Sequence, residues 1–424
     1  MVGPVILALL VQQDLVEQFF AEKDRDKRRE IASRLKDVPL DTLDGMIRES
    51  PRPALRARSG QAPPDAAEGA GTVLKRESKA DFGGEAFHYL VYVPEKYDPS
   101  KKWRALVSLH GHGGVAEHAI EWWRRQAREE GDLFVIAPDT KKHTWGGPRQ
   151  GHSIALTALR EVMRDFRIDP DRVFLDGASM GGVGTFCIAA HHPDRWAGIA
   201  PRARGPRTEY TETDGKRTHR AKLADNYRGL PIYWVYGEKD PVVPLDILLD
   251  VRKQFESMKL DVVYAQHPGG HDWVPEETPK VAGWMRKQAR DPYAAEVTFA
   301  TVEKHFLRSR WIEIERTAEG RTVTMNHMGM NDELCETRSE WVREARVVAR
   351  REKNRIELRT ENVKSLVVHL HERMVDFAQP VEIVVNGTSV WRKKVETSRL
   401  RMLESAFERD RGMFYSAGVA VKVP

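Results

Sequence analysis

The sequence predicts an α/β fold, with a mostly parallel sheet covered by helices on both faces, followed by a separate β-rich domain. Apolar strand-like runs alternate with helix-like runs through the middle of the chain, as a parallel sheet requires. After about residue 292 the pattern changes to closely spaced strand-like runs. The length of 424 residues exceeds what one hydrophobic core usually supports, so two domains are expected.

Composition indicates a soluble globular protein that binds neither nucleic acid nor the membrane interior. The chain is 41% hydrophobic and 31% charged. Its net charge of +5 comes from 68 basic and 63 acidic residues that are well interspersed, which indicates a solvated surface and not a nucleic-acid footprint. The two cysteines, Cys187 and Cys335, form neither a disulfide framework nor a zinc motif. No stretch approaches the roughly 20 apolar residues of a membrane span.

The first 71 residues predict a signal peptide over 1–12 and a helical segment with a linker over 13–71. Residues 5–11 have the length of a signal-peptide apolar region, although a charged n-region and an Ala-x-Ala site are missing. We expect export to the periplasm or the medium, with a cytoplasmic location as the alternative. Apolar residues recur among dense charges from Asp14 to Ser50, as in two short amphipathic helices. Residues 51–71 are rich in Pro, Ala, Gly and Ser, which favours a linker.

Residues 72–292 predict the α/β domain. Apolar runs predict strands at Phe87–Val93, Ala105–Leu109, Leu133–Ala137, Val173–Leu175, Gly198–Ala200, Ile232–Tyr236 and Val262–Gln266. Helices are expected between them at Ile120–Glu129, Ser153–Asp165, Val183–Ala190, Leu245–Met258 and Val274–Arg290. The run Arg202–Arg228 is polar and basic, and we expect it to be a surface excursion outside the core.

Residues 293–424 predict a β-rich domain without chemistry of its own. Strand-like runs occur at Glu296–Thr301, Trp311–Glu315, Thr322–Met325, Arg355–Leu358, Leu366–Leu370, Val381–Val385 and Ser389–Arg392. Asn386-Gly387 lies between the last two runs, and this dipeptide between apolar runs is the strongest short hairpin signal. A helix is expected over Ser398–Arg409, before a final strand.

The segment most informative about chemistry is Gly177-Ala178-Ser179-Met180-Gly181, which follows the apolar strand at Val173–Leu175. A nucleophilic serine is presented on a sharp strand-to-helix turn, where the close approach of the two segments needs residues with little or no side chain. The same pattern also occurs in ordinary strand-to-helix connections, so the assignment of Ser179 as nucleophile depends on its partners.

An activated serine needs a base and an acid that orients the base. Asp240 follows the strand at Ile232–Tyr236 and is the predicted acid. Glu238 lies too near the strand end and Asp246 begins the next helix, so both are weaker candidates, and a turn carboxylate without a catalytic role is the alternative. His271 follows the next strand, Val262–Gln266, and two glycines, and is the predicted base. His267 is the fallback for this role.

The loop Leu109-His110-Gly111-His112-Gly113-Gly114 follows an early strand and predicts an oxyanion hole. A tetrahedral oxyanion is stabilised by fixed main-chain amides, one from the residue after the nucleophile and one from an earlier loop. Met180 and His112 are the expected donors through their amides, with Gly111 as a near neighbour. A metal site at His110 and His112 is the alternative, but no further ligand adjoins them at ligand spacing.

These motifs together resemble α/β-hydrolase serine esterases over roughly residues 85–290. The relevant segments are His-Gly-x-Gly-Gly, Asp-Pro-Asp-Arg-Val, Gly-x-Ser-Met-Gly-Gly, Gly-x-x-Asp-x-x-Val-Pro and Gly-Gly-His-Asp-Trp. The resemblance is to the polyhydroxybutyrate depolymerase, feruloyl esterase and phospholipase/carboxylesterase group, with prolyl oligopeptidase-like domains next. It implies the α/β-hydrolase fold, a Ser179–His271–Asp240 triad, no metal or organic cofactor, and a small-molecule or polymeric ester as substrate. The N-terminal segment, the basic excursion and the β-rich end depart from the compact members.

Three hypotheses of function remain after this reasoning. The first is a serine carboxylic-ester hydrolase that works through an acyl-enzyme. The second is a prolyl oligopeptidase-like serine peptidase, although about 85 residues before the hydrolase core are too few for the propeller that such enzymes carry. The third is a non-catalytic protein whose β-rich end binds a polymer or a partner.

Overall fold

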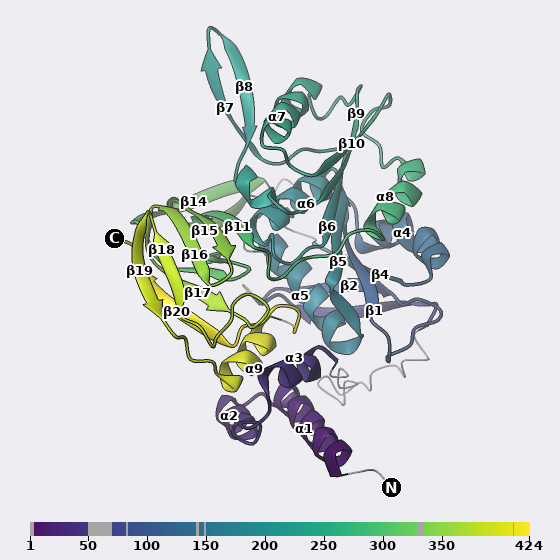
Figure 1. Ribbon diagram of the computed structural model, residues 1–424. Helices are drawn as coiled ribbons and strands as arrows, with labels where there is room; N and C mark the ends of the chain where they lie inside the picture. The colour runs from purple at the N-terminus through teal and green to yellow at the C-terminus, as the bar shows by residue number, and fades with distance from the viewer. Residues whose placement is uncertain are drawn as a thin grey trace.

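The computed structural model describes residues 4–49, 70–81, 84–140, 144–147, 150–328, 334–409 and 411–424. Figure 1 shows the N-terminal helices in purple, a central sheet flanked by helices in blue and teal, and a β-rich part in green and yellow beside it. Within the described ranges, no helix combines the length and apolar character needed to cross a membrane. The predicted linker lies almost wholly outside the described residues.

The central sheet has eight strands in the order β1-β2-β4-β3-β5-β6-β9-β10. Neighbouring strands from β4 to β10 are parallel, whereas β1 pairs with β2, and β2 with β4, in antiparallel fashion. The predicted mostly parallel sheet is therefore confirmed. The strands are β1 (Val73–Lys79), β2 (Ala86–Tyr92), β3 (Trp103–Leu109), β4 (Leu133–Pro138), β5 (Ile168–Ala178), β6 (Gly198–Arg202), β9 (Ile232–Gly237) and β10 (Val262–His267).

Helices cover both faces of this sheet, as Figure 1 shows. One hydrophobic core joins the sheet to α5 (Gln150–Asp165), α6 (Met180–His191) and α7 (Leu245–Ser257). A second core on the opposite face joins it to α4 (Ala116–Glu130) and α8 (Thr278–Met285). The central strands β3 and β4 are consequently buried along their whole length. Helix α8 is shorter than predicted at both ends, because a 3-10 turn, η2 (Pro275–Glu277), precedes it and the helix already ends at Met285.

The basic excursion contains a hairpin of β7 (Thr208–Thr213) and β8 (Lys216–Ala221), followed by the 3-10 turn η1 (Ala224–Tyr227). The hairpin projects from the body of the molecule in Figure 1, so the prediction of a surface excursion is confirmed for this part. It is wrong for the two ends, because Arg202 is 0% exposed and Tyr227 1% exposed. Arg202 ends a central strand, and the Tyr227 hydroxyl donates to the Phe186 carbonyl at 3.0 Å.

The C-terminal part consists of two sheets that share one hydrophobic core. The six-stranded sheet contains β11 (Glu296–Glu303), β14 (Gly320–Met328), β15 (Leu334–Glu352), β16 (Arg355–Glu361), β18 (Val381–Val385) and β19 (Thr388–Lys393). The four-stranded sheet contains β12 (Arg308–Ser309), β13 (Ile312–Thr317), β17 (Val363–Leu370) and β20 (Ala417–Lys422). The predicted hairpin is confirmed, since Asn386 and Gly387 link β18 to β19 with φ values of 50° and 86°.

The N-terminal helices pack on the C-terminal part. Three helices are present where two were expected: α1 (Pro4–Ala21), α2 (Arg25–Ser33) and α3 (Leu40–Glu49). They form one core with α9 (Arg399–Glu408), in which Phe19 and Leu43 meet Leu403. Asp44 of α3 adds polar contacts, because it lies 2.8 Å from Arg373 of the C-terminal part. The segment predicted as a signal peptide is, from residue 4 onward, continuous with α1.

Candidate active site

Ser179 lies at the turn between β5 and α6, with a strained backbone of φ 57° and ψ −113°. A residue with a side chain adopts positive φ at a cost of roughly 1–3 kcal/mol, and such strain is typical of functional sites. Glycines allow the turn: a Cβ on Gly177 would lie 2.6 Å from the Gly181 carbonyl oxygen, and one on Gly181 would lie 2.1 Å from that of Leu109. The small residues of this motif are therefore required by the packing of β5, α6 and β3.

The predicted nucleophile, base and acid meet in space although they come from three separate loops. The Ser179 Oγ lies 2.7 Å from His271 Nε2, and His271 Nδ1 lies 2.7 Å from Asp240 Oδ2. Asp240 is 1% exposed and His271 21% exposed at their side chains. With these partners, the neutral imidazole donates its Nδ1 proton to the carboxylate and accepts the serine proton at Nε2. The arrangement can remove a proton from the Ser179 hydroxyl.

The acid is held by its own loop. Asp240 Oδ1 accepts hydrogen bonds from the amides of Val242 at 2.8 Å and Val243 at 3.0 Å, which leaves Oδ2 for His271. The weaker candidates lie elsewhere: Glu238 accepts from Gln266 at 2.9 Å, and Asp246 is exposed in the first turn of α7.

The fallback base, His267, is not the histidine that is hydrogen-bonded to Ser179. It ends β10, and its Nδ1 accepts from the Gly269 amide at 3.2 Å. The glycines before His271 allow a close crossing of loops, because a Cβ on Gly237 would lie 2.2 Å from the Gly270 carbonyl oxygen. This crossing carries the His271 loop back over the end of β9.

The residues expected to donate main-chain amides, Met180, Gly111 and His112, occupy different positions near the serine. Met180 is the first residue of α6, and the first amides of a helix have no intrahelical acceptor. Gly111 touches the turn, since a Cβ placed on it would lie 3.7 Å from the Ser179 Cβ. His112 is the next residue and is exposed. A carbonyl oxygen held between Gly111 and the start of α6 would face main-chain amides and the positive end of the helix dipole.

His110 fixes the loop that carries these residues. It is 0% exposed, its Nδ1 lies 2.8 Å from the Gly111 carbonyl oxygen, and its Nε2 accepts the Thr140 amide at 3.2 Å. Burial lowers the pKa of His110 below its ordinary value, which keeps the ring neutral for this pattern. Trp145 adds a bond from its indole Nε1 to the His110 carbonyl at 2.9 Å. Both ring nitrogens of His110 are thus engaged by the protein.

One group of described side chains has the composition of a metal site. His88, Glu117 and Asp139 offer ligand atoms within 4.8 Å of one another. His88 Nε2 lies 3.5 Å from Asp139 Oδ2, which also accepts the Ala116 amide at 3.3 Å. An imidazole and two carboxylates suit a divalent transition metal, and none of the three takes part in the hydrogen bonds that join Ser179, His271 and Asp240.

A buried polar network beneath the serine was not predicted from the sequence. The carboxylate of Asp176, on β5, accepts from Ser108 and Trp123 at 2.9 Å each and from Arg202 Nε at 3.2 Å. Arg202 also donates from Nη1 to the Trp273 carbonyl at 3.2 Å and stacks on the Trp273 ring at 3.8 Å. Burial raises the pKa of Asp176, while the guanidinium and the two other donors oppose this shift. The network connects the strand before Ser179 to the chain after His271.

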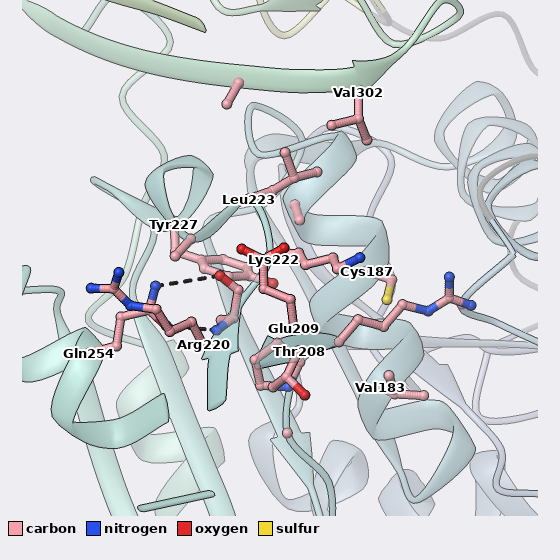
Figure 2. A pocket seen from close by; sticks show the side chains of 18 of the residues that line it. Val183, Cys187, Thr208, Glu209, Arg220, Lys222, Leu223, Tyr227, Gln254 and Val302 are labelled. Carbon is pink, nitrogen blue, oxygen red and sulfur yellow. Dashed lines mark hydrogen bonds between the residues drawn. The ribbon is translucent and has the colours of Figure 1, made fainter. Parts of the chain in front are cut away.

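A cavity of about 1080 Å³ lies beside this site. Its walls include Val183 and Cys187 of α6, the projecting hairpin, and strands β11 and β15 of the C-terminal part. Figure 2 shows Val183 and Cys187 on one side of the cavity, Thr208 and Glu209 beside them, and Val302 on the far side. The cavity therefore lies between the central domain and the C-terminal part.

Comparison with known proteins agrees with this architecture. Residues 83–278 match the family described as "Putative esterase". The central domain is an α/β-hydrolase of the serine esterase kind. The hydrolase domain is 25% identical over 174 residues to "Probable feruloyl esterase C" of Aspergillus terreus, covering 39% of this chain and 60% of that protein. It is 23% identical over 221 residues to "Feruloyl esterase C" of Emericella nidulans, covering 44% and 77%.

A solved thermostable esterase aligns with 51% of this chain and 63% of its own, at 21% identity and a TM-score of 0.44. The chain thus spans only part of the length of the first relatives that it matches. The N-terminal helices and the whole C-terminal part, from β11 onward, lie outside the matched region, residues 83–278.

Proposed function

We propose that the chain hydrolyses carboxylic esters through an acyl-enzyme formed on Ser179. The observation that carries this proposal is the continuous chain of two 2.7 Å hydrogen bonds from Ser179 through His271 to Asp240. The strained turn at Ser179 and the neighbouring amides of Met180 and Gly111 also support it. Because two of the relatives are named feruloyl esterases, we include feruloyl esters among the first substrates to test.

The reaction follows from the roles of the three side chains. The Ser179 Oγ attacks the carbonyl carbon while its proton moves to His271 Nε2, and the oxyanion accepts bonds from the amides of Met180 and the Gly111–His112 loop. The tetrahedral intermediate then expels the alcohol, which takes the proton from His271. Water attacks the acyl-enzyme by the same route, and Ser179 leaves with its proton restored. Asp240 holds the imidazole tautomer and stabilises the imidazolium throughout.

Hydrolysis of 4-nitrophenyl esters by the wild type and by Ser179→Ala tests this proposal. We expect kcat to fall by at least about a thousandfold in the variant, because nucleophile and base act as one unit. Ser257→Ala is the matched control, since Ser257 is exposed at the end of α7 and only donates to the Gln254 carbonyl. Ester turnover by Ser179→Ala at the wild-type rate would refute the proposal.

A serine-directed phosphonate separates the peptidase hypothesis from the non-catalytic one. Labelling of Ser179 without ester turnover would favour cleavage of peptide amides, which the same side chains can perform. Neither turnover nor labelling would favour a binding protein.

We also propose that the protein is exported, with a cytoplasmic location as the alternative. Leu9, Leu10 and Val11 of α1 are 43%, 58% and 51% exposed, so the folded protein does not bury these three apolar side chains. N-terminal sequencing of the protein from a secreting host tests this, and an uncleaved N-terminus on protein found only in the cytoplasm would contradict it.

A further inference from the structure

The cavity of about 1080 Å³ is lined by residues from two segments that adjoin the proposed triad. Val183, which lines it, lies one helical turn after the serine, and its amide donates to the Ser179 carbonyl at 3.1 Å. Val242 and Val243 also line it, and their amides hold the Asp240 carboxylate. A molecule bound in the cavity therefore lies against the segments that carry the proposed nucleophile and acid.

The far wall comes from the C-terminal part of the chain. Ala300 and Val302 of β11 and Trp341 of β15 line the cavity there. The indole Nε1 of Trp341 is buried without a hydrogen-bond partner among the described residues, which leaves it as a donor for a ligand. Ligand sites occur preferentially between domains, and this volume reaches the upper end of the roughly 300–1,000 Å³ of small-molecule sites. It is larger than a short acyl group requires.

Two arginines line the part of the cavity next to α6. A Cβ on Gly182 would lie 3.1 Å from the Arg204 Cβ, so Arg204 starts beside the first turn after Ser179. A Cβ on Gly146 would lie 3.0 Å from an Arg207 Nη atom, so this glycine leaves the space that the guanidinium occupies. Neither arginine forms an ion pair with a carboxylate of the described part of the chain.

The other charges of the cavity have different surroundings. Arg228 is paired with Asp225 at 3.0 Å, and Glu209 lies directly across the hairpin from Arg220. Glu303 and Glu344 belong to the C-terminal wall, on β11 and β15. Lys222 and Arg321 also line the cavity. Arg204 and Arg207 are the arginines of the cavity that lie beside α6, on the side of the proposed triad.

We propose that this cavity binds the part of the ester that is remote from the reacting carbonyl, and that this part carries a carboxylate held by Arg204 and Arg207. The proposal rests on the proposed esterase function. A guanidinium presents a planar fork of donors that matches a carboxylate, and such charge-assisted bonds are about twice as strong as neutral ones. The C-terminal part then serves as a wall of the substrate site.

The position of Arg207 indicates where the anion lies. Its charge acts on both Cys187 and His191 of α6. Cys187 is eight residues beyond Ser179, which at 1.5 Å per residue is about 12 Å along the helix. Arg204 lies closer to the serine. We therefore expect an elongated anionic substrate to be preferred to a short one.

The test compares anionic and neutral esters of the same length. Mono-4-nitrophenyl esters of dicarboxylic acids from succinate to sebacate are each paired with the neutral 4-nitrophenyl ester of equal chain length. In the wild type, the ratio of kcat/KM values, anionic over neutral, should rise with length and exceed about tenfold. A second arm compares 4-carboxyphenyl butyrate with phenyl butyrate, in case the carboxylate belongs to the alcohol.

Substitutions test whether the preference for anionic esters, measured as the ratio of kcat/KM values, arises in the cavity. Arg207→Gln should lower it about tenfold to a hundredfold, and Arg207→Lys should restore part of it. Arg217→Gln is the matched control, because Arg217 lies on the same hairpin outside the cavity and is paired with Glu212 at 3.0 Å. Its ratio should stay within about twofold of the wild type, as expected for an exposed pair.

The outcomes separate this inference from the proposed function. Turnover of neutral esters with a ratio near one in both arms, or a ratio that Arg207→Gln leaves unchanged, would overturn the inference alone. No turnover of any ester would refute the esterase function. Titration calorimetry with suberate would then show whether the cavity binds a carboxylate. Binding that is lost in Arg207→Gln supports the carboxylate site, whereas no binding, or equal binding in both proteins, overturns it.

Discussion

Replacing Arg202 by methionine should destabilise the hydrolase domain by about 3–5 kcal/mol at neutral pH, the usual cost of breaking a buried ion pair by removing one partner. The side chains of Arg202 and Asp176 are both 0% exposed, and Nε lies 3.2 Å from Oδ2. Methionine fills much of the same volume but leaves the Asp176 carboxylate in the interior without its counter-charge. Ser108 and Trp123 still donate to it and offset part of the loss.

The sign of the pH dependence follows from Asp176. Burial raises its folded-state pKa above the ordinary 3.8, and loss of the Arg202 charge should raise it further. The folded variant then binds a proton more readily than the unfolded chain, so its stability is greater at low pH and falls as pH rises through the folded-state pKa. The difference in the free energy of unfolding between variant and wild type should therefore be largest near neutral pH and shrink as pH falls toward 3.8.

Urea unfolding followed by tryptophan fluorescence measures this loss. Arg125→Met is the control, because Arg125 is 93% exposed and its pair with Glu129 should contribute less than about 1 kcal/mol. Adding Asp176→Asn to Arg202→Met should recover part of the stability, because the uncompensated charge is gone. A loss below about 1 kcal/mol in Arg202→Met would refute the reasoning. So would a loss in the double variant that equals the sum of the losses in Arg202→Met and Asp176→Asn.

The same variant should lower kcat, because Arg202 positions the chain after His271. Its Nη1 donates to the carbonyls of Trp273 at 3.2 Å and Val274 at 3.3 Å. A misplacement of about 1 Å far from the chemistry can cost roughly a hundredfold in rate. Arg202→Lys keeps the charge and should recover part of kcat. A wild-type kcat in the folded fraction of Arg202→Met would indicate a purely structural role for Arg202.

Two further predictions concern glycine and an acidic residue. Gly181→Ala should cost about 1–3 kcal/mol and most of the activity, since its Cβ would lie 2.1 Å from the Leu109 carbonyl oxygen. Gly283→Ala, in open space on α8, should instead gain about 0.5–1 kcal/mol, and equal melting temperatures for the two variants would contradict this packing. Burial raises the pKa of Asp44, but His371, Arg48 and another arginine outweigh it and lower the pKa to about 2. Asp44→Asn should therefore cost about 2 kcal/mol at pH 7, and this difference should disappear as pH falls from about 4 through about 2, which a pH series of melting temperatures would show.

The sequence by itself determined the central sheet and the order of the candidate site residues along it. Buried parallel strands are nearly continuous apolar runs, so β3, β4 and β9 could be recognised without the structure. The loops after such strands meet at one edge of the sheet, which brings Ser179, Asp240 and His271 together. Local turn chemistry was equally readable, as the Asn386-Gly387 hairpin shows.

Only the tertiary structure decided the features that depend on contacts between distant segments. Strand β1 is mostly polar and pairs at the sheet edge, so its residues form no apolar run to recognise. Arg202 belongs to a basic stretch, and its burial depends on Asp176, 26 residues away in the chain. The cavity along α6 exists because the C-terminal sheet packs against the hydrolase domain, a contact without a local sequence signal. Local pattern fixes which face of an element is apolar, whereas the partner of a charge and the shape of a cavity are set by segments that meet only after folding.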